Sequence, residues 1–250
     1  MLWLLAGLLL LGPTPESIQG QQRLREGQRL MSSERFEEAA QAFREAIEFD
    51  PLLVMAHYGL GQAHMALKEY PSAVTAFRGA REAFHKRAAE GVSRRMDNES
   101  AREDRIRALR DKIRENQDRQ LPAGSIAAQQ RDTRIQQWEL QIAMLQRAQT
   151  ELQYETIPDL PPGLSLALGS AHFRSGQLAD AEREYRAALA VQPKLGEPRN
   201  NLAVVLLLTG RPAEAKEQLA LAEKNGFKVP VGLKKDVETA LATGSNSPRP

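Results

Sequence analysis

The sequence predicts an all-α fold, a helical solenoid interrupted by a long helical hairpin. A pattern of small and apolar residues recurs with a period of 34 residues in two separate parts of the chain. Between these parts lies a charged segment whose apolar residues follow the three/four spacing of coiled helices. Aromatic residues make up 5% of the chain and charged residues 26%, which is ordinary for a helical protein rich in Ala, Leu, Arg and Glu.

The recurring pattern has four copies, each aligned on one small residue. In every copy an alanine follows 12 residues later, then a large side chain four residues on, then another alanine. Each copy therefore predicts two helices of about 12 residues, which cross where the small residue lets the backbones approach. One such pair cannot bury its apolar face alone, so neighbouring pairs must stack. The small residues are Gly27, Gly61, Gly169 and Ala203, and the large ones are Phe43, Phe77, Tyr185 and Leu219.

The spacing resembles that of the tetratricopeptide repeat, over residues 20–87 (repeats 1 and 2) and 162–229 (repeats 3 and 4). "SGQ" at 175–177 and "TGR" at 209–211 are its expected turns, with glycine where positive φ is wanted. No copy has the large aromatic residue early in the first helix, and Pro212 fills an apolar slot of the fourth copy. We expect the fold to survive, with the second helix of repeat 4 starting late.

Residues 88–161 lack the repeat pattern and form a charged insert. Ile135, Trp138, Ile142 and Leu145 follow a coiled-coil seam, and "LPAGS" at 121–125 is a turn signal. We prefer a helical hairpin with two arms of about 26 residues, or roughly 40 Å, each. Two degenerate solenoid units and an intermolecular coiled coil are the alternatives. Three prolines in the stretch 154–163 end the insert.

The two ends of the chain differ in composition from the repeats and from the insert. Residues 1–20 contain the run "LWLLAGLLLLG", too short to span a bilayer but typical of a signal peptide, although no Lys or Arg precedes it. A secreted or periplasmic protein is expected, and membrane association by an uncleaved N-terminal segment is the alternative. Residues 230–243 predict a capping helix with Val231, Val237 and Leu241 facing inward, and 244–250 a disordered tail.

Chemistry-bearing patterns are sparse. With no cysteine, thiolate metal sites and disulfides are excluded, and a net charge of +2 gives no field that favours nucleic acid. The single Glu-x-x-His, from Glu82 to His85, is expected to face solvent. His172 takes the slot in repeat 3 that His64 takes in repeat 2, which indicates packing and not ligation. We expect no catalytic residue, cofactor, metal ion or small-molecule substrate, and hence no enzyme.

The family resemblance implies a concave groove, lined by the first helix of each repeat, that binds a peptide or a partner helix. Its methionines suit a surface that repacks around its partner. The alternative is that the insert or the C-terminal segment fills the groove and makes it ordinary core. Only Asn201 matches the Lys, Asn and Arg clamp with which some members hold a C-terminal carboxylate, so chaperone-tail binding is not implied. The groove-facing positions are Leu24, Gln28, Met31, Met55, Tyr58, Gln62, Met65, Leu166, Ser170, Phe173, Arg174, Asn200, Val204 and Leu207.

The sequence therefore predicts a non-catalytic protein–protein interaction scaffold or adaptor in the periplasm or envelope of a bacterium. The alternative is a structural assembly protein that self-associates through the coiled-coil insert, as a homo-oligomer joined by residues 92–158.

Overall fold

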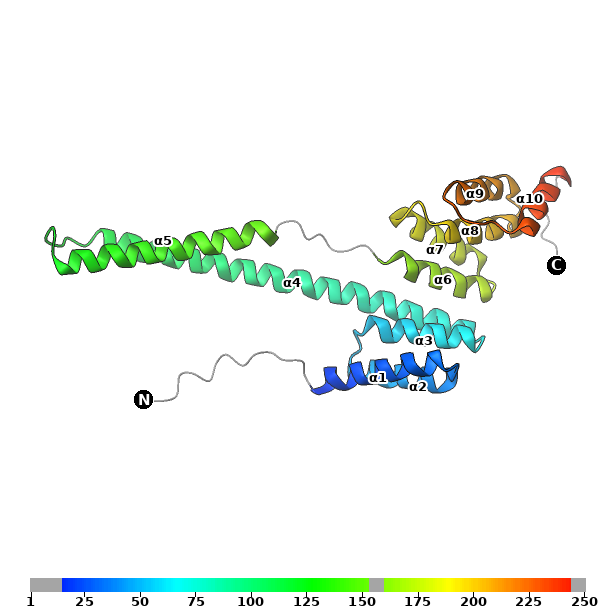
Figure 1. Cartoon of the computed structure of the whole chain (residues 1–250), viewed down its shortest axis with the longest axis horizontal. Coiled ribbons are helices and arrows are strands. Elements are labelled where there is room, and N and C mark those ends of the chain that lie inside the picture. Colours follow the sequence, from blue (N-terminus) through cyan, green and yellow to red (C-terminus); the bar gives the residue numbers. More distant parts are fainter. Residues whose placement is uncertain (1–14, 153–159, 244–250) are drawn as a thin grey trace. The chain divides into compact units, whose positions relative to one another are not determined.

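The computed structural model describes residues 15–152 and 160–243, and within them it has ten helices and no strand (Figure 1). The predicted all-α class is confirmed. Most of the predicted signal peptide, the tail 244–250 and most of the proline-rich stretch lie outside the described residues. The chain divides into two compact units, Met1–Lys86 with Asp159–Pro250, and Arg87–Pro158.

The first unit is a stack of helix pairs that coincide with the four sequence copies, which confirms the repeat solenoid. Helices α2 and α7 are amphipathic, with their alanines and one aromatic residue buried. The pairs are α1 (Pro15–Ser32) with α2 (Phe36–Phe49), α3 (Val54–Ala66) with the start of α4 (Tyr70–Gln117), α6 (Pro162–Arg174) with α7 (Leu178–Val191), and α8 (Gly196–Leu208) with α9 (Pro212–Lys224).

A close approach of glycine to an aromatic ring sets the packing of each of the first three pairs. A methyl group on Gly61 would lie 2.5 Å from a ring atom of Phe77, and one on Gly169 would lie 2.7 Å from Tyr185. Real Cβ atoms do not come so close, so only glycine fits these crossings. Repeat 4 has Ala203 instead, and there the large residue is the smaller Leu219. The small residue and its packing partner thus change together within one chain.

The turns inside the four repeats share one backbone conformation. Its left-handed residue is Gly176 or Gly210 in the last two repeats, both with φ of 75°, as the turn signals predict. Glu34 and Lys68 occupy the same place in the first two repeats, with φ of 56° and 61°. In each turn the following N–H donates to a carbonyl five residues earlier, for example from Gln177 to His172 at 2.9 Å. Each first helix is therefore closed in the same way, whatever residue stands at the turn.

The expected late start of the second helix in repeat 4 is wrong. Helix α9 begins at Pro212, in register with Leu178 at the start of α7. Proline is tolerated in the first position of a helix because its missing N–H would have no partner there and its fixed φ already suits the helix. Pro212 therefore stands at the apolar position of repeat 4 and is also the first residue of α9.

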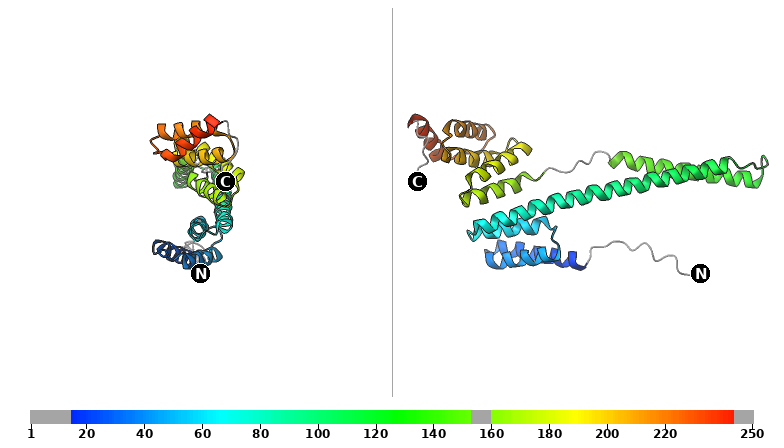
Figure 2. Two further views of the ribbon diagram at one scale, coloured as in Figure 1. Left: turned by 90° about the vertical axis from the view of Figure 1, so that its right-hand side faces the viewer. Right: turned by 180° about the vertical axis from the view of Figure 1, so that it is seen from behind.

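Repeat 3 stacks on repeat 2 although a long segment separates them in sequence. Phe77 and Val74 of α4 share one buried cluster with Leu168 of α6. Beside this cluster, Arg81 donates to Glu184 of α7 at 2.5 Å, and the Glu184 side chain is only 7% exposed. Figure 2 shows α6 alongside the first turns of α4. The solenoid of the first unit is therefore continuous across the interruption.

Helix α10 (Val231–Thr243) closes the stack, but its inward face differs from the expected one. Val237 is buried, whereas Val231 is 81% exposed and Leu241 is also exposed, so two of the three predicted inward residues are wrong. Leu233 packs against the core with Val237, because a four-residue step keeps both on one helix face, and Val229 joins them from just before the helix. Val231 is the first residue of the helix and points away from that face.

The second unit pairs the remainder of α4 with α5 (Ile126–Leu152) (Figure 2). Both helices are unbroken and far longer than the 13- or 14-residue helices of repeats 3 and 4. Ile106, Leu109 and Ala128 are buried in this pair, and the predicted seam residues of α5 are half-buried. The expected turn falls between the helices, with Gly124 at φ of 75°.

Replacing Gly61 with alanine should destabilise the protein by about 1–3 kcal/mol, because the added methyl collides with the buried Phe77 ring. Adding Phe77→Leu recreates the Ala203–Leu219 pair of repeat 4. The double variant should therefore lose less free energy of unfolding than the two single variants lose together. Urea unfolding of wild type, both single variants and the double variant measures this coupling. Gly163→Ala, which meets nothing within 4 Å, is the matched control. Strict additivity of the two substitutions would contradict the packing argument.

Candidate functional site

A pocket of about 220 Å³ opens on the side of the stack formed by the first helices of repeats 2, 3 and 4. Its walls come from four helices, α3, α6, α7 and α8, so no single repeat forms it. It exists only because repeat 3 stacks on repeat 2. The lining residues are Met65, Ser170, Phe173, Arg174, Tyr185, Asn201 and Val204. We call it the concave pocket.

Polar groups line one part of the concave pocket. The Tyr185 hydroxyl lies 3.4 Å from Ser170 Oγ, and burial raises the pKa of Tyr185, with a smaller contribution from the carboxylate of Glu197. Burial and then Glu197 also raise the pKa of Tyr58. These phenols therefore stay protonated and can act as hydrogen-bond donors at neutral pH.

Asn201 of α8 adds an amide group to this part, and its neighbour Asn200 lies outside the pocket lining. Asn200 Nδ2 donates to Asn201 Oδ1 at 3.3 Å. Asn200 Oδ1 is buried and has no hydrogen-bond partner among the described residues. A buried polar atom without a partner costs free energy, but Asn200 is not among the residues that line the pocket, so Asn201 is the amide that a ligand meets there.

The remaining walls are apolar, with one cation at the rim. Met65, Phe173 and Val204 are half-buried and supply the apolar surface. Arg174 is exposed at the end of α6, and within the described part of the chain it forms no ion pair. The pocket can therefore accept an apolar side chain beside a hydrogen-bonding or acidic group.

The predicted groove residues fall into three environments. Met65, Phe173 and Arg174 come together in the concave pocket, as do Ser170 and Val204. Met31, Tyr58, Leu166 and Leu207 are half-buried and pack against the core, Tyr58 with its ring 5.4 Å from that of Phe77, and Asn200 is half-buried beside Asn201. Met55, which is 52% exposed, lies on the open surface with Gln62 and Gln28. Leu24 is buried and belongs to the core group.

Tyr185 lines the concave pocket although its sequence position marks it only as the large packing residue of repeat 3. A signal was present, because the equivalent residues of the first two copies are Phe43 and Phe77, which lack the hydroxyl. An added hydroxyl at a core position indicates a polar neighbour, here Ser170.

The histidines have structural roles. His64 Nδ1 donates to Glu69 at 2.6 Å and His172 Nδ1 donates to Gln177 at 2.5 Å, so each ring ties a first helix to the turn after it. Both rings are buried, which fits the packing role indicated by their recurrence. Throughout residues 15–152 and 160–243 there is no cluster of three or more potential metal-ligating side chains. Over the same residues no helix is long and apolar enough to cross a bilayer.

Stacked helix pairs with a hollow on their concave side define the class of helical-repeat interaction proteins. A sequence model of the family described as "Tetratricopeptide repeat" matches residues 24–88 and 166–226, about half of the chain. The chain belongs to the tetratricopeptide repeat family. Proteins of this family are generally non-catalytic interaction scaffolds, so membership points to protein–protein interaction.

Individual proteins resemble the chain more weakly. It is 35% identical over 57 residues to the Hsp70-Hsp90 organising protein of Plasmodium falciparum (isolate 3D7), a match that covers 23% of this chain and 10% of that protein. The structure of TTC0263, a tetratricopeptide protein of Thermus thermophilus, aligns with 89% of this chain and 99% of its own at 20% identity and a TM-score of 0.34. That of PilW, a type IV pilus biogenesis factor, aligns with 91% of this chain and 88% of its own at 15% identity and a TM-score of 0.42.

The raised pKa of Tyr185 predicts a loss of stability in alkali. The unfolded phenol ionises near pH 10, whereas the folded one stays neutral, so the contribution is complete below about pH 10 and is lost as pH rises through the folded pKa. Urea unfolding between about pH 8 and pH 11 should show wild type losing stability more steeply above pH 10 than Tyr185→Phe does. Below pH 10 the two curves should run parallel. Parallel curves over the whole range would show that burial of this hydroxyl has no such effect.

Proposed function

We propose that this protein is a non-catalytic scaffold or adaptor that binds a segment of a partner protein in its concave groove, at the concave pocket. The observation that carries the proposal is a hollow lined from three repeats, with apolar walls, the amide of Asn201 and the unpaired Arg174. Binding sites of this kind combine apolar surface with a few convergent polar groups.

The chemistry of the pocket describes the segment it would take. An aliphatic or aromatic side chain fits against Met65, Phe173 and Val204. A polar group of the segment can form a hydrogen bond with the amide of Asn201, which lines the pocket. An acidic group near the rim pairs with Arg174. We therefore expect a short apolar peptide or helix face with an acidic residue at its edge.

Membership of the tetratricopeptide repeat family supports a protein or peptide as the ligand. The organising protein is named for the two chaperones that it organises, and the similarity covers a tenth of its length. Our proposal for this chain rests on the pocket and leaves the identity of the partner to experiment. It assigns no role to nucleic acid or to a small-molecule substrate.

For location, we propose export to the periplasm or envelope of a bacterium. The support is the apolar run in residues 1–20, whose length matches the apolar region of a signal peptide. An uncleaved segment would instead leave the protein attached to the membrane by its N-terminus.

A photo-crosslinking residue at Phe173 or at Met65 should capture the same discrete partner protein in the native host, because both side chains face one pocket. A matched probe at Leu221, which is exposed on α9 away from this pocket, should not capture it. Mass spectrometry of the crosslinked species identifies the partner. Adding Arg174→Ala should weaken capture without unfolding the protein, since Arg174 is exposed. Identical products from all three probe positions, or none from the pocket, would argue against the groove.

A second candidate function is self-association through the second unit. On α5, Leu140 is 58% exposed and Met144 is 62% exposed, one helical turn apart on the same face. Glu139 is the one charged residue between 135 and 146. A helix face with two large exposed apolar residues and no charged residue between them can pair with its own copy.

Light scattering behind size exclusion tests this candidate on the chain from residue 21 onward. Wild type should have twice the mass of the Leu140→Glu, Met144→Glu double variant, because two introduced charges prevent the face from pairing. Met96→Glu, an equally exposed position on α4, should leave the mass of wild type unchanged. A monomeric wild type removes the candidate and leaves the concave pocket as the interaction site.

A further inference from the structure

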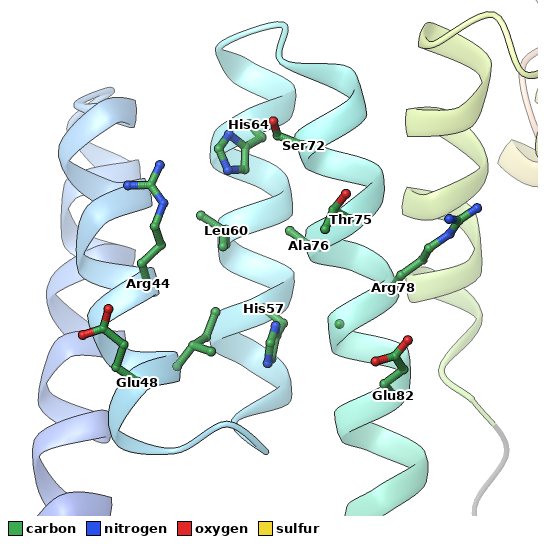
Figure 3. A pocket seen from close by; sticks show the side chains of 12 residues that line it. Arg44, Glu48, His57, Leu60, His64, Ser72, Thr75, Ala76, Arg78 and Glu82 are labelled. Atoms are coloured by element: carbon green, nitrogen blue, oxygen red, sulfur yellow. The ribbon is translucent and has the colours of Figure 1, made fainter.

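A second groove lies on the stack between the second helices of repeats 1 and 2, with α3 as its floor (Figure 3). It has a volume of about 700 Å³ and is lined only by residues of α2, α3 and the first turns of α4. None of its lining residues lines the concave pocket. We call it the outer groove.

The equivalent place between repeats 3 and 4 is spanned by side chains of the protein itself. Arg186 of α7 bonds Glu182 on its own helix at 2.9 Å and Glu214 of α9 at 3.4 Å, and Arg211 also bonds Glu182. These contacts lower the pKa of Glu182, chiefly through the hydrogen bond from Arg211. One arginine thus joins two neighbouring second helices through carboxylates.

The outer groove has an arginine at the position equivalent to Arg186, but no carboxylate at the positions equivalent to Glu182 and Glu214. Arg44 is the counterpart of Arg186, 142 residues earlier in the aligned repeats. Ala40 stands where Glu182 would be, and Ser72 where Glu214 would be. Among the described residues Arg44 forms no ion pair, and it donates a hydrogen bond to Gln41 on its own helix.

At the end of the outer groove near His57, the side chains are smaller than their counterparts between repeats 3 and 4. Between repeats 3 and 4, Arg199 donates to the Pro193 carbonyl at 2.7 Å and to Gln218 of α9 at 2.8 Å. Its counterpart is His57, which makes the same contact with the Pro51 carbonyl at 3.0 Å but reaches no further.

The residues that would face the longer side chain are also reduced. Ala76 replaces Gln218, and Gly79 replaces Leu221. The His57 ring lies against Gly79 so closely that a methyl group there would be 2.6 Å from Nδ1. The His57 ring thus occupies the space beside Gly79, and Ala76 is too short to bridge to it as Gln218 bridges to Arg199.

The outer groove has charge of one sign at each end. Arg44 of α2 and Ser72 of α4 stand at the end near His64, and Glu48 of α2 and Glu82 of α4 stand at the end near His57 (Figure 3). Arg78 of α4 also belongs to the lining, but its side chain is directed away from α3 (Figure 3). Neither glutamate has an ion pair among the described residues, and Arg followed by Glu four residues later is the less favourable order on a helix. The two ends are about 6 Å apart along α2, the rise of four helical residues.

We propose that the outer groove is a docking site for a helix of a partner protein that carries an acidic and a basic residue four positions apart. The acidic side chain takes the place that Glu182 and Glu214 occupy beside Arg186, between Arg44 and the Ser72 hydroxyl. The basic side chain lies between Glu48 and Glu82. Apolar residues between them cover Ile47, Leu60 and Ala76. This site is independent of the concave pocket and does not rest on the function proposed for it.

Fluorescence anisotropy with short alanine-based helical peptides tests the proposal on the full chain. The probe peptide carries one Glu-x-x-x-Arg pair beside two leucines, and the matched peptides carry Gln-x-x-x-Gln, Glu-x-x-x-Glu or Arg-x-x-x-Arg. The Glu/Arg peptide should bind at least about tenfold more tightly than each of the other three, and the difference should shrink in high salt. A Glu/Arg peptide that does not bind, or binds no more tightly than the Gln/Gln peptide, overturns the proposal.

Two variants locate the site. Arg44→Glu changes an exposed residue and should weaken the Glu/Arg peptide at least about tenfold. The triple variant His57→Arg, Ala76→Gln, Gly79→Leu installs the side chains of repeats 3 and 4 and should abolish binding while circular dichroism stays unchanged. Arg174→Ala in the concave pocket should have no effect. Unchanged binding by Arg44→Glu, or equal loss in Arg174→Ala, overturns the assignment to the outer groove.

Discussion

The contact of α6 with α4 is the constraint on which the rest of the first unit depends. A single helix pair cannot bury its apolar face, so repeat 2 needs a following first helix, and the chain supplies it only after the segment 87–158. Phe77, Leu168 and the Arg81–Glu184 pair make that contact. It brings Met65 of α3 to the same pocket as residues of α6, α7 and α8, and therefore creates the concave pocket from parts that are more than 100 residues apart.

The four repeats share a backbone plan and differ in what they present to each side. At the helix crossings the one change in size is matched, since Gly61 and Phe77 become Ala203 and Leu219 in repeat 4. Positions on the surface of the stack vary freely, because no close approach restricts them. Side chains span the outer face between repeats 3 and 4, whereas between repeats 1 and 2 the same face is open and keeps unpaired charges. Function can therefore differ along a solenoid whose core is uniform.

The candidate site could be predicted in part. Met65, Phe173 and Arg174 follow from helical register, because every first helix turns the same face to the concave side. Register could not indicate that Met31 and Leu207 pack against the core or that Tyr185 reaches the pocket from α7. Those outcomes depend on how deeply each pair sits in the stack. For the same reason the sequence predicted that Val231 and Leu241 of α10 face inward, whereas both are exposed.

The sequence by itself determined the all-α class, the repeat length, the turns and the small-residue crossings, because these depend on contacts within 34 residues of chain. It also marked the segment in which the repeat pattern stops. Only the tertiary structure decided that α6 continues the stack begun by α4, and which surface positions meet to form the concave pocket and the outer groove. The physical reason is that periodicity fixes the face of a helix, while the neighbour that covers or leaves open that face comes from a distant part of the chain.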